Sequence, residues 1–180
     1  MNRYLPTVAC VAIAFMSGCG DDPAGPSGEG WQEVTVDGIT LAWLAEGDSL
    51  QVELTAPTTG WVAAGFDPSV GMQDANILIG YFDADSSSTA IRDDWGNAPA
   101  SHRSDLLMGG TEDILSFEAS ESAGTTTLSF AILLDTGDAY DKPLEHGSSY
   151  DVILAYGPDG ADDFTTQHEL ATVTTVTLQE

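Results

Sequence analysis

Residues 31–55 have the sequence WQEVTVDGITLAWLAEGDSLQVELT, which contains three short β-rich runs separated by two turns. The first turn is the dipeptide Asp37-Gly38, which favours a tight hairpin. The second turn is Glu-Gly-Asp at 46–48. Apolar residues alternate with polar ones in the third run, as in a strand with one buried face: Leu50, Val52 and Leu54. The stretch predicts consecutive antiparallel strands.

The rest of the chain repeats this pattern of short runs and turn residues. Further strands are predicted at 61–66, 75–82, 88–92, 113–119, 125–134, 149–156 and 172–178. The runs at 61–66 and 75–82 are continuously apolar, which is typical of fully buried strands. About nine to eleven strands in a domain of this length predict an all-β fold, an antiparallel two-sheet β-sandwich of immunoglobulin-like architecture. A closed barrel is the alternative.

The chain is strongly acidic. Its 180 residues include 29 Asp and Glu against only 4 Lys and Arg, for a formal net charge of −25. Binding to nucleic acid requires basic surface that displaces counterions from phosphates, so this charge excludes nucleic acid as a partner. It equally argues against adhesion to anionic lipid through a basic patch. The length is that of one domain.

The first residues resemble an export signal. Arg3 precedes an apolar stretch at 5–15, which is too short to span a bilayer. The sequence MSGC at 16–19 then resembles a bacterial lipobox, which implies cleavage before Cys19 and attachment of diacylglycerol to its thiol. An ordinary signal peptide with an incidental cysteine is the alternative. The lipobox predicts a domain anchored by lipid to a bacterial membrane, outside the cytoplasm.

This interpretation divides the chain into three parts: a lipoprotein signal peptide at 1–18, the lipidated Cys19 with a Gly/Pro/Ser-rich linker at 19–30, and a folded domain at 31–180. The two cysteines, Cys10 and Cys19, both lie before the domain. The domain therefore contains no disulfide and no thiolate metal site, and its core must stabilise it.

Familiar catalytic motifs are absent from the sequence: there is no Cys-x-x-Cys, Gly-x-Ser-x-Gly, phosphate loop or dinucleotide-binding glycine pattern. An independent hydrolase is the least favoured function. The run DTGDAYD at 135–141 has the oxygen ligands that calcium prefers, but it lacks the order of the helix–loop–helix site, and a turn stabilised by aspartates is favoured. His102 and His146 lie among turn residues, where we expect them to be solvated.

Five segments carry a resemblance to a known family. They are GWVAAGF at 60–66, GMQDANILIG at 71–80, LDTGD at 134–138 with DKPL at 141–144, VILAYG at 152–157, and QH at 167–168. In this order they resemble the DOMON domain, the β-sandwich module of dopamine-β-monooxygenase-like proteins and of the cytochrome domain of cellobiose dehydrogenase. The resemblance covers nearly the whole of the predicted domain. It departs from the family at Asn76 and Gln167, where an Asp and a Tyr are common.

In haem-binding members of this family, one Met and one His ligate a b-type haem. By position, the resemblance implies that Met72 and His168 are the axial ligands of haem b, held noncovalently. It also implies apolar pocket walls, for which we predict Trp61, Phe66, Ile79 and Phe164. Two strong axial ligands leave no site for oxygen, so the implied function is electron transfer with a redox partner protein rather than independent catalysis.

Two other functions stay open at this stage. The family also includes domains proposed to bind sugars, so the alternative is a carbohydrate or other small-ligand binding module without haem. For that function, Trp95 in the loop-like run RDDWGN is the candidate residue, because sugars stack on aromatic faces. A third alternative is an accessory domain for a separate membrane redox partner.

Overall fold

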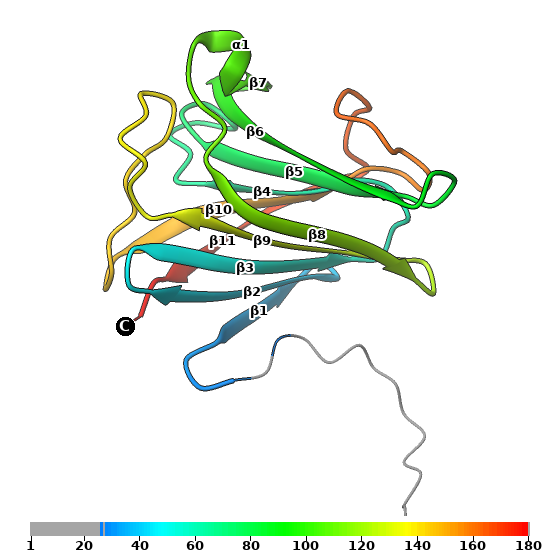
Figure 1. Cartoon of the computed structure of the whole chain (residues 1–180), viewed down its shortest axis with the longest axis horizontal. Helices are drawn as coiled ribbons and strands as arrows, with labels where there is room; N and C mark the ends of the chain where they lie inside the picture. The colour runs from blue at the N-terminus through cyan, green and yellow to red at the C-terminus, as the bar shows by residue number, and fades with distance from the viewer. Residues whose placement is uncertain (1–25, 27, 180) are drawn as a thin grey trace, which may run out of the picture.

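The computed structural model of the chain describes residue 26 and residues 28–179. The predicted signal peptide, Cys19 and most of the predicted linker lie outside the described residues. Two antiparallel sheets face each other across one hydrophobic core (Figure 1). Within the described part of the chain, no helix has the length and apolar character needed to cross a membrane.

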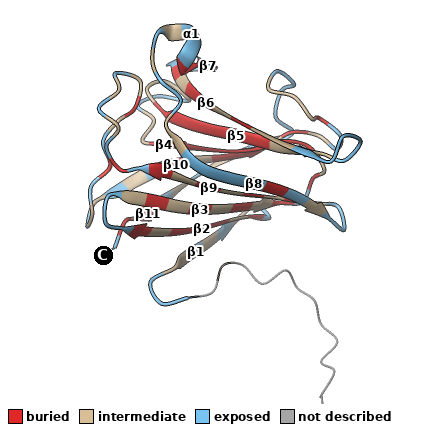
Figure 2. Cartoon of the chain, in the orientation of Figure 1, coloured by how far each residue is buried: buried red, intermediate tan, exposed pale blue. Residues whose placement is uncertain are grey.

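The first sheet contains five strands in the order β1-β2-β3-β9-β8. Their bounds are β1 Gln32–Val36, β2 Ile39–Glu46, β3 Ser49–Ala56, β9 Thr125–Leu133 and β8 Ile114–Ser122. Strands β3 and β9 alternate strictly between buried and partly exposed positions, because one face packs on the core and the other faces solvent. Edge strand β8 is mostly exposed (Figure 2).

The second sheet contains six strands in the order β11-β10-β4-β5-β6-β7. Their bounds are β11 Leu170–Thr177, β10 Ser149–Tyr156, β4 Val62–Phe66, β5 Asn76–Asp83, β6 Ser88–Ala98 and β7 Ser101–Ser104. A single turn of helix, α1 (Asp105–Met108), follows β7. Strand β4 is buried at all of its positions, which means that both of its faces are covered.

Tight turns connect the strands as the sequence predicts. In the β1–β2 turn, Asp37 and Gly38 have φ values of 50° and 84°, and in the β8–β9 turn Ala123 and Gly124 have 52° and 80°. Two successive residues with positive φ are the signature of the type I′ hairpin, whose twist matches that of the strands. The indole of Trp43 donates to the carbonyl of Thr177 at 3.1 Å, so one hydrogen bond also joins the two sheets.

The predicted β-sandwich is confirmed: the described residues form eleven strands in two open sheets rather than a closed barrel. Two local predictions needed correction. Strand β6 extends from Ser88 to Ala98 rather than ending at 92, and β7 and α1 follow where no element was predicted. The missed segment contains Gly96, Asn97 and Pro99 in close succession, residues typical of turns, so no strand was predicted there.

Replacing a core leucine by alanine should destabilise the sandwich far more than the same change on its surface. Leu54 is 0% exposed and Leu115 is 55% exposed. We expect Leu54→Ala to lower the free energy of unfolding by about 2–5 kcal/mol, because it removes apolar contacts and leaves a cavity. Leu115→Ala is the matched control and should change it by about 0.5 kcal/mol or less. Urea denaturation measures both, and equal losses would contradict this assignment of the core.

Candidate functional site

The outer face of the six-stranded sheet is the apolar floor of a candidate site. Directly paired residues of antiparallel strands lie on the same face of a sheet. The register thus places two rows of mostly apolar residues across β10, β4, β5 and β6: Ile153, Gly65, Ile77 and Asp94, and Ala155, Ala63, Ile79 and Arg92. The central strand β4 contributes only Gly65 and Ala63 to this face, so no large side chain fills the space above the middle of the floor.

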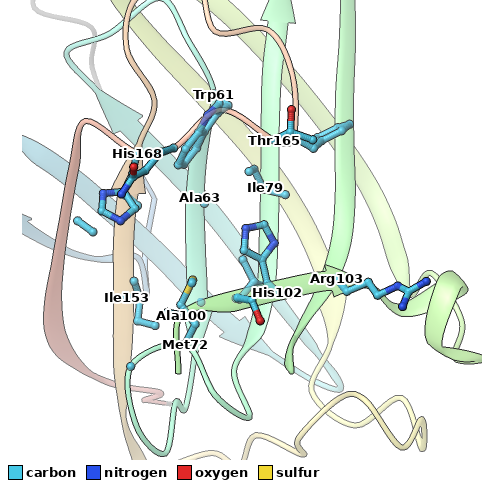
Figure 3. A pocket seen from close by; sticks show the side chains of 18 of the residues that line it. Trp61, Ala63, Met72, Ile79, Ala100, His102, Arg103, Ile153, Thr165 and His168 are labelled. Carbon is cyan, nitrogen blue, oxygen red and sulfur yellow. The ribbon is translucent and has the colours of Figure 1, made fainter. Parts of the chain in front are cut away.

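A cavity of about 770 Å³ lies over this floor. Its walls come from the β4–β5 loop, the β6–β7 turn with β7, and the β10–β11 loop. In Figure 3, Trp61 and His168 lie toward one end of the cavity, Met72 lies toward the other, and His102 lies on the side across from His168. The volume is that of a site for a small molecule or an organic cofactor.

Backbone contacts fix the position of Met72. Its N–H donates to the carbonyl of Pro99 at 3.0 Å, and its own carbonyl accepts from Ala75 at 3.1 Å. Gly96 makes this close approach feasible, because a Cβ at that position would lie 1.6 Å from the Met72 carbonyl oxygen. Gly71 has φ of +60°, a conformation that favours glycine. The β4–β5 loop is therefore held against the β6–β7 turn, and Met72 is presented to the cavity.

Trp61 holds the β10–β11 loop over the other end of the cavity. Its indole N–H donates to the carbonyl of Thr166 at 3.1 Å, and its backbone carbonyl accepts from Gly157 at 2.8 Å. A Cβ at Gly157 would lie 2.4 Å from the indole nitrogen, so the ring packs where only glycine leaves room. The loop that carries Phe164 and His168 is anchored in this way.

A charged network borders the cavity on the β6 side. Arg92 donates twice to the Asp94 carboxylate, at 2.5 and 2.6 Å, and its guanidinium stacks on Phe164 at 4.5 Å from the ring centre. His102 Nδ1 lies 2.5 Å from Asp94 Oδ2, the same oxygen that accepts from Arg92 Nη2. Asp94 is fully buried, and burial alone would raise its pKa. The hydrogen bonds from His102 and Arg92 outweigh burial and lower the pKa below its usual value.

Five of the predicted haem-site residues line this one cavity: Met72, His168, Trp61, Ile79 and Phe164. Phe66 does not line it. Phe66 lies on the opposite face of β4 and packs in the core between the sheets. His102, Arg92 and Arg103 also line the cavity and were not predicted. His102 was expected to be solvated among turn residues, but β7 places it in the cavity wall (Figure 3).

Trp95, the candidate for sugar binding, lies outside the cavity. It pairs with Asn76 on the other face of the sheet from the floor. Its ring packs edge-on against Tyr140, with the ring centres 6.3 Å apart and an angle of 67° between the planes. It is half-buried, and its position supports a packing role.

Comparison with known proteins agrees with this architecture. The sequence profile of the DOMON domain matches residues 36–157, more than half of the chain, and the chain belongs to the DOMON domain family. No curated protein sequence matches the chain.

Two solved structures share the fold. The cytochrome b domain of pyranose dehydrogenase from Coprinopsis cinerea superposes with a TM-score of 0.56 and 15% identity, over 77% of this chain and 75% of that one. The cytochrome domain of cellobiose dehydrogenase from Myriococcum thermophilum superposes with a TM-score of 0.52 and 10% identity, over 83% of this chain and 82% of that one. At these identities the likeness establishes the fold.

Replacing Asp94 should destabilise the protein in a pH-dependent way. A carboxyl whose pKa is lowered by folding stabilises the folded state above the unfolded pKa of about 3.9, and this contribution is lost as pH falls through the lower folded pKa. Asp94→Asn leaves the Arg92 and His102 donors without their anion. We expect it to cost about 1–3 kcal/mol at pH 7.

The difference between the two proteins should shrink when urea denaturation is repeated at pH values below 4. The exposed turn residue Asp48 provides the control, because Asp48→Asn makes the same chemical change without a buried ion pair. A cost for Asp94→Asn that stayed constant down to the lowest pH at which the protein folds would contradict the role of its charge.

Proposed function

We propose that this DOMON domain binds one b-type haem noncovalently and transfers single electrons. The observation that carries the proposal is that Met72 and His168, which are distant in sequence, border the same apolar cavity. The cavity also has the apolar lining that a porphyrin requires. The two structural neighbours are cytochrome domains, which supports the same function for this chain.

The residues present fit the group. The volume of about 770 Å³ lies within the range of cofactor sites. Small side chains on the floor, Ala63, Gly65 and Ala155, leave a flat surface for a planar ring, while Trp61 and Phe164 supply aromatic walls. There is no cysteine in the domain, so the group would be held without a thioether bond to the chain.

Each part of the cavity has a role in this function. The thioether of Met72 and the imidazole of His168 would ligate the iron, and a haem with both of these ligands would serve electron transfer rather than oxygen chemistry. Bound haem supplies a reversible one-electron couple. The apolar floor excludes water, and the hydrogen bonds that fix the Met72 loop and the Trp61-anchored loop keep the ligand geometry rigid. A rigid site favours electron transfer, because little has to move when the charge changes.

The cellular setting follows from the sequence and forms part of the proposal. Cys19 carries the lipid, and the domain is displayed outside the cytoplasm on a bacterial membrane. The partner is a redox protein that exchanges electrons with the haem. The chain's net charge of −25 favours a partner with a basic contact surface, because opposite charges accelerate encounter.

Hemin titration of the recombinant protein tests the function directly. We expect saturation at one haem per chain and, after reduction with dithionite, the sharp α and β bands of a six-coordinate low-spin haem. His168→Ala and Met72→Ala should each abolish this spectrum, because either variant loses one axial ligand. His146→Ala is the matched control, since His146 Nε2 bonds the carbonyl of Gly47 and lies outside the cavity.

His102→Ala tests which histidine ligates the iron, separately from whether the protein binds haem. His102 lines the cavity, but its Nδ1 is held by Asp94, and we expect its removal to leave the low-spin spectrum in place. Loss of that spectrum in His102→Ala with retention in His168→Ala would overturn His168 as the ligand. A broad free-hemin spectrum in the unmodified protein would overturn haem binding altogether, and a screen of small ligands would follow.

A further inference from the structure

Three aspartates from distant parts of the sequence meet at one edge of the sandwich. Asp93 is paired with Leu78 on the core-facing side of β6. Asp105 is the first residue of α1, and Asp141 lies in the loop between β9 and β10. Their exposed fractions are 2%, 0% and 8%. Carboxylates are rarely buried to this degree unless a partner compensates their charge.

The geometry is that of a shared ligand site. One carboxylate oxygen from each of the three residues lies within 4.8 Å of the other two. Two oxygens on opposite sides of one Ca²⁺ lie about 4.6–5.2 Å apart, twice the usual bond length. Four buried oxygens of these residues have no hydrogen-bond partner within the described part of the chain: Asp93 Oδ1, both oxygens of Asp105, and Asp141 Oδ1. Asp105 is the clearest case, since it is fully buried and neither oxygen of its carboxylate has a hydrogen-bond partner in the described part of the chain.

Neighbouring carboxylates differ from these three. The Thr111 hydroxyl lies 2.7 Å from Asp113 and 2.8 Å from Asp138, and Asp138 also accepts from the backbone of Thr111 and Tyr140. Those bonds explain the acidic turn without any ion. They leave Asp93, Asp105 and Asp141 as the members of the cluster that keep buried oxygens without a hydrogen-bond partner in the described part of the chain.

Electrostatics make the cluster costly without a counterion. Burial, reinforced by the charges of other aspartates, raises the pKa of Asp93 to about 7 and that of Asp105 to about 8. Each of the charges that shift these two groups is another carboxylate, so the chain concentrates negative charge here. Asp94 is also buried but lies on the outer face of β6, where Arg92 and His102 bind its carboxylate.

We propose that Asp93, Asp105 and Asp141 bind one Ca²⁺ ion, which ties β6 to α1 and to the β9–β10 loop. Several carboxylate oxygens with no nitrogen or sulfur ligand select a hard cation. Ca²⁺ accepts six to eight oxygens in flexible geometry, so water or carbonyl oxygens complete the shell, whereas Mg²⁺ demands a near-ideal octahedron.

The surrounding contacts show what the ion would stabilise. The Tyr140 hydroxyl donates to the carbonyl of Met108 at 2.9 Å, which joins the β9–β10 loop to α1. A Cβ at Gly110 would lie 2.8 Å from the Tyr140 ring, so the two segments pack as closely as glycine allows. Figure 1 shows α1 and β7 at the end of the six-stranded sheet where β8 begins. An ion here would close the open edge between the two sheets.

This site is independent of the cavity. Asp93 points to the core-facing side of β6 and its neighbour Asp94 to the outer side. Binding of Ca²⁺ can therefore be measured on protein without haem. Failure of one proposal leaves the other standing.

The test compares urea unfolding of the recombinant chain in EDTA and in CaCl₂ at matched ionic strength. We expect the unfolding midpoint to rise with the logarithm of Ca²⁺ concentration, as mass action requires for an ion that binds only the folded state. Isothermal titration calorimetry should give one site per chain. MgCl₂ should give a clearly smaller shift, and an equal response to Mg²⁺ would overturn the assignment to Ca²⁺.

Isosteric variants make the result specific. In EDTA, Asp105→Asn should be at least as stable as the unmodified protein, because burial disfavours the ionised carboxylate and the amide of Asn is neutral at every pH. In CaCl₂ the order should reverse, since the variant loses the Ca²⁺-induced shift. Asp135→Asn, an exposed carboxylate of the same acidic loop, is the control and should keep the full shift. No Ca²⁺-dependent shift in the unmodified protein, or an equal shift in Asp105→Asn, would overturn the proposal.

Discussion

Burial of β4 and β5 on both faces is the constraint on which the rest of the structure depends. The inner face of these strands packs on the five-stranded sheet through Val62, Phe66 and Leu78. The outer face carries Ala63, Ile77 and Ile79 and has no second sheet to cover it. Loops must cover it instead, and they leave a cavity because loops cannot pack as continuously as strands. The candidate site therefore follows from the sandwich itself: one sheet is hydrophobic on both sides.

Close backbone approaches at two glycines hold the walls of the cavity against the floor. Gly96 lets the β6–β7 turn approach the Met72 loop, and Gly157 lets the Trp61 ring lie under the β10–β11 loop. These positions fix the two walls relative to the sheet, at opposite ends of the cavity. Because each wall is held by backbone hydrogen bonds and by a packed backbone, the Met72 and His168 ends are set by the fold and do not depend on a ligand for their place.

Local pattern was enough to predict the sandwich, because alternating residues at 50, 52 and 54 and the Asp37-Gly38 turn specify strands and hairpins without distant information. It could not assign faces in an apolar strand. Phe66 was predicted in the pocket and lies in the core, because every residue from 61 to 66 is apolar or small and only the pairing with β5 and β10 shows which side faces inward.

The site needed information that periodicity does not contain. Met72 and His168 were singled out by a family resemblance, since no spacing rule relates them. His102 was missed because a four-residue edge strand among turn residues gives little signal. Asp141 was read as part of an acidic turn, and Asp135 and Asp138 do bond that turn. Its meeting with Asp93 and Asp105 depends on how the two sheets close at their edge, which only the three-dimensional structure gives.

Asp93 and Asp94 show how one strand can serve two chemically different sites. They are adjacent in the chain, yet folding raises the pKa of the first and lowers that of the second. Successive side chains of β6 point to opposite faces of the sheet. Asp94 therefore contacts Arg92 and His102 on the outer face, while Asp93 lies among other carboxylates on the core-facing side. Among the described residues, Arg92 pairs with Asp94, Lys142 pairs with Asp67, and Arg103 is exposed. With its basic side chains placed elsewhere, the buried carboxylate cluster must draw its compensating charge from solution, as a proton or as a metal ion. One oxygen from each of the three carboxylates lies within 4.8 Å of the other two, which suits a shared oxygen-liganded cation such as Ca²⁺.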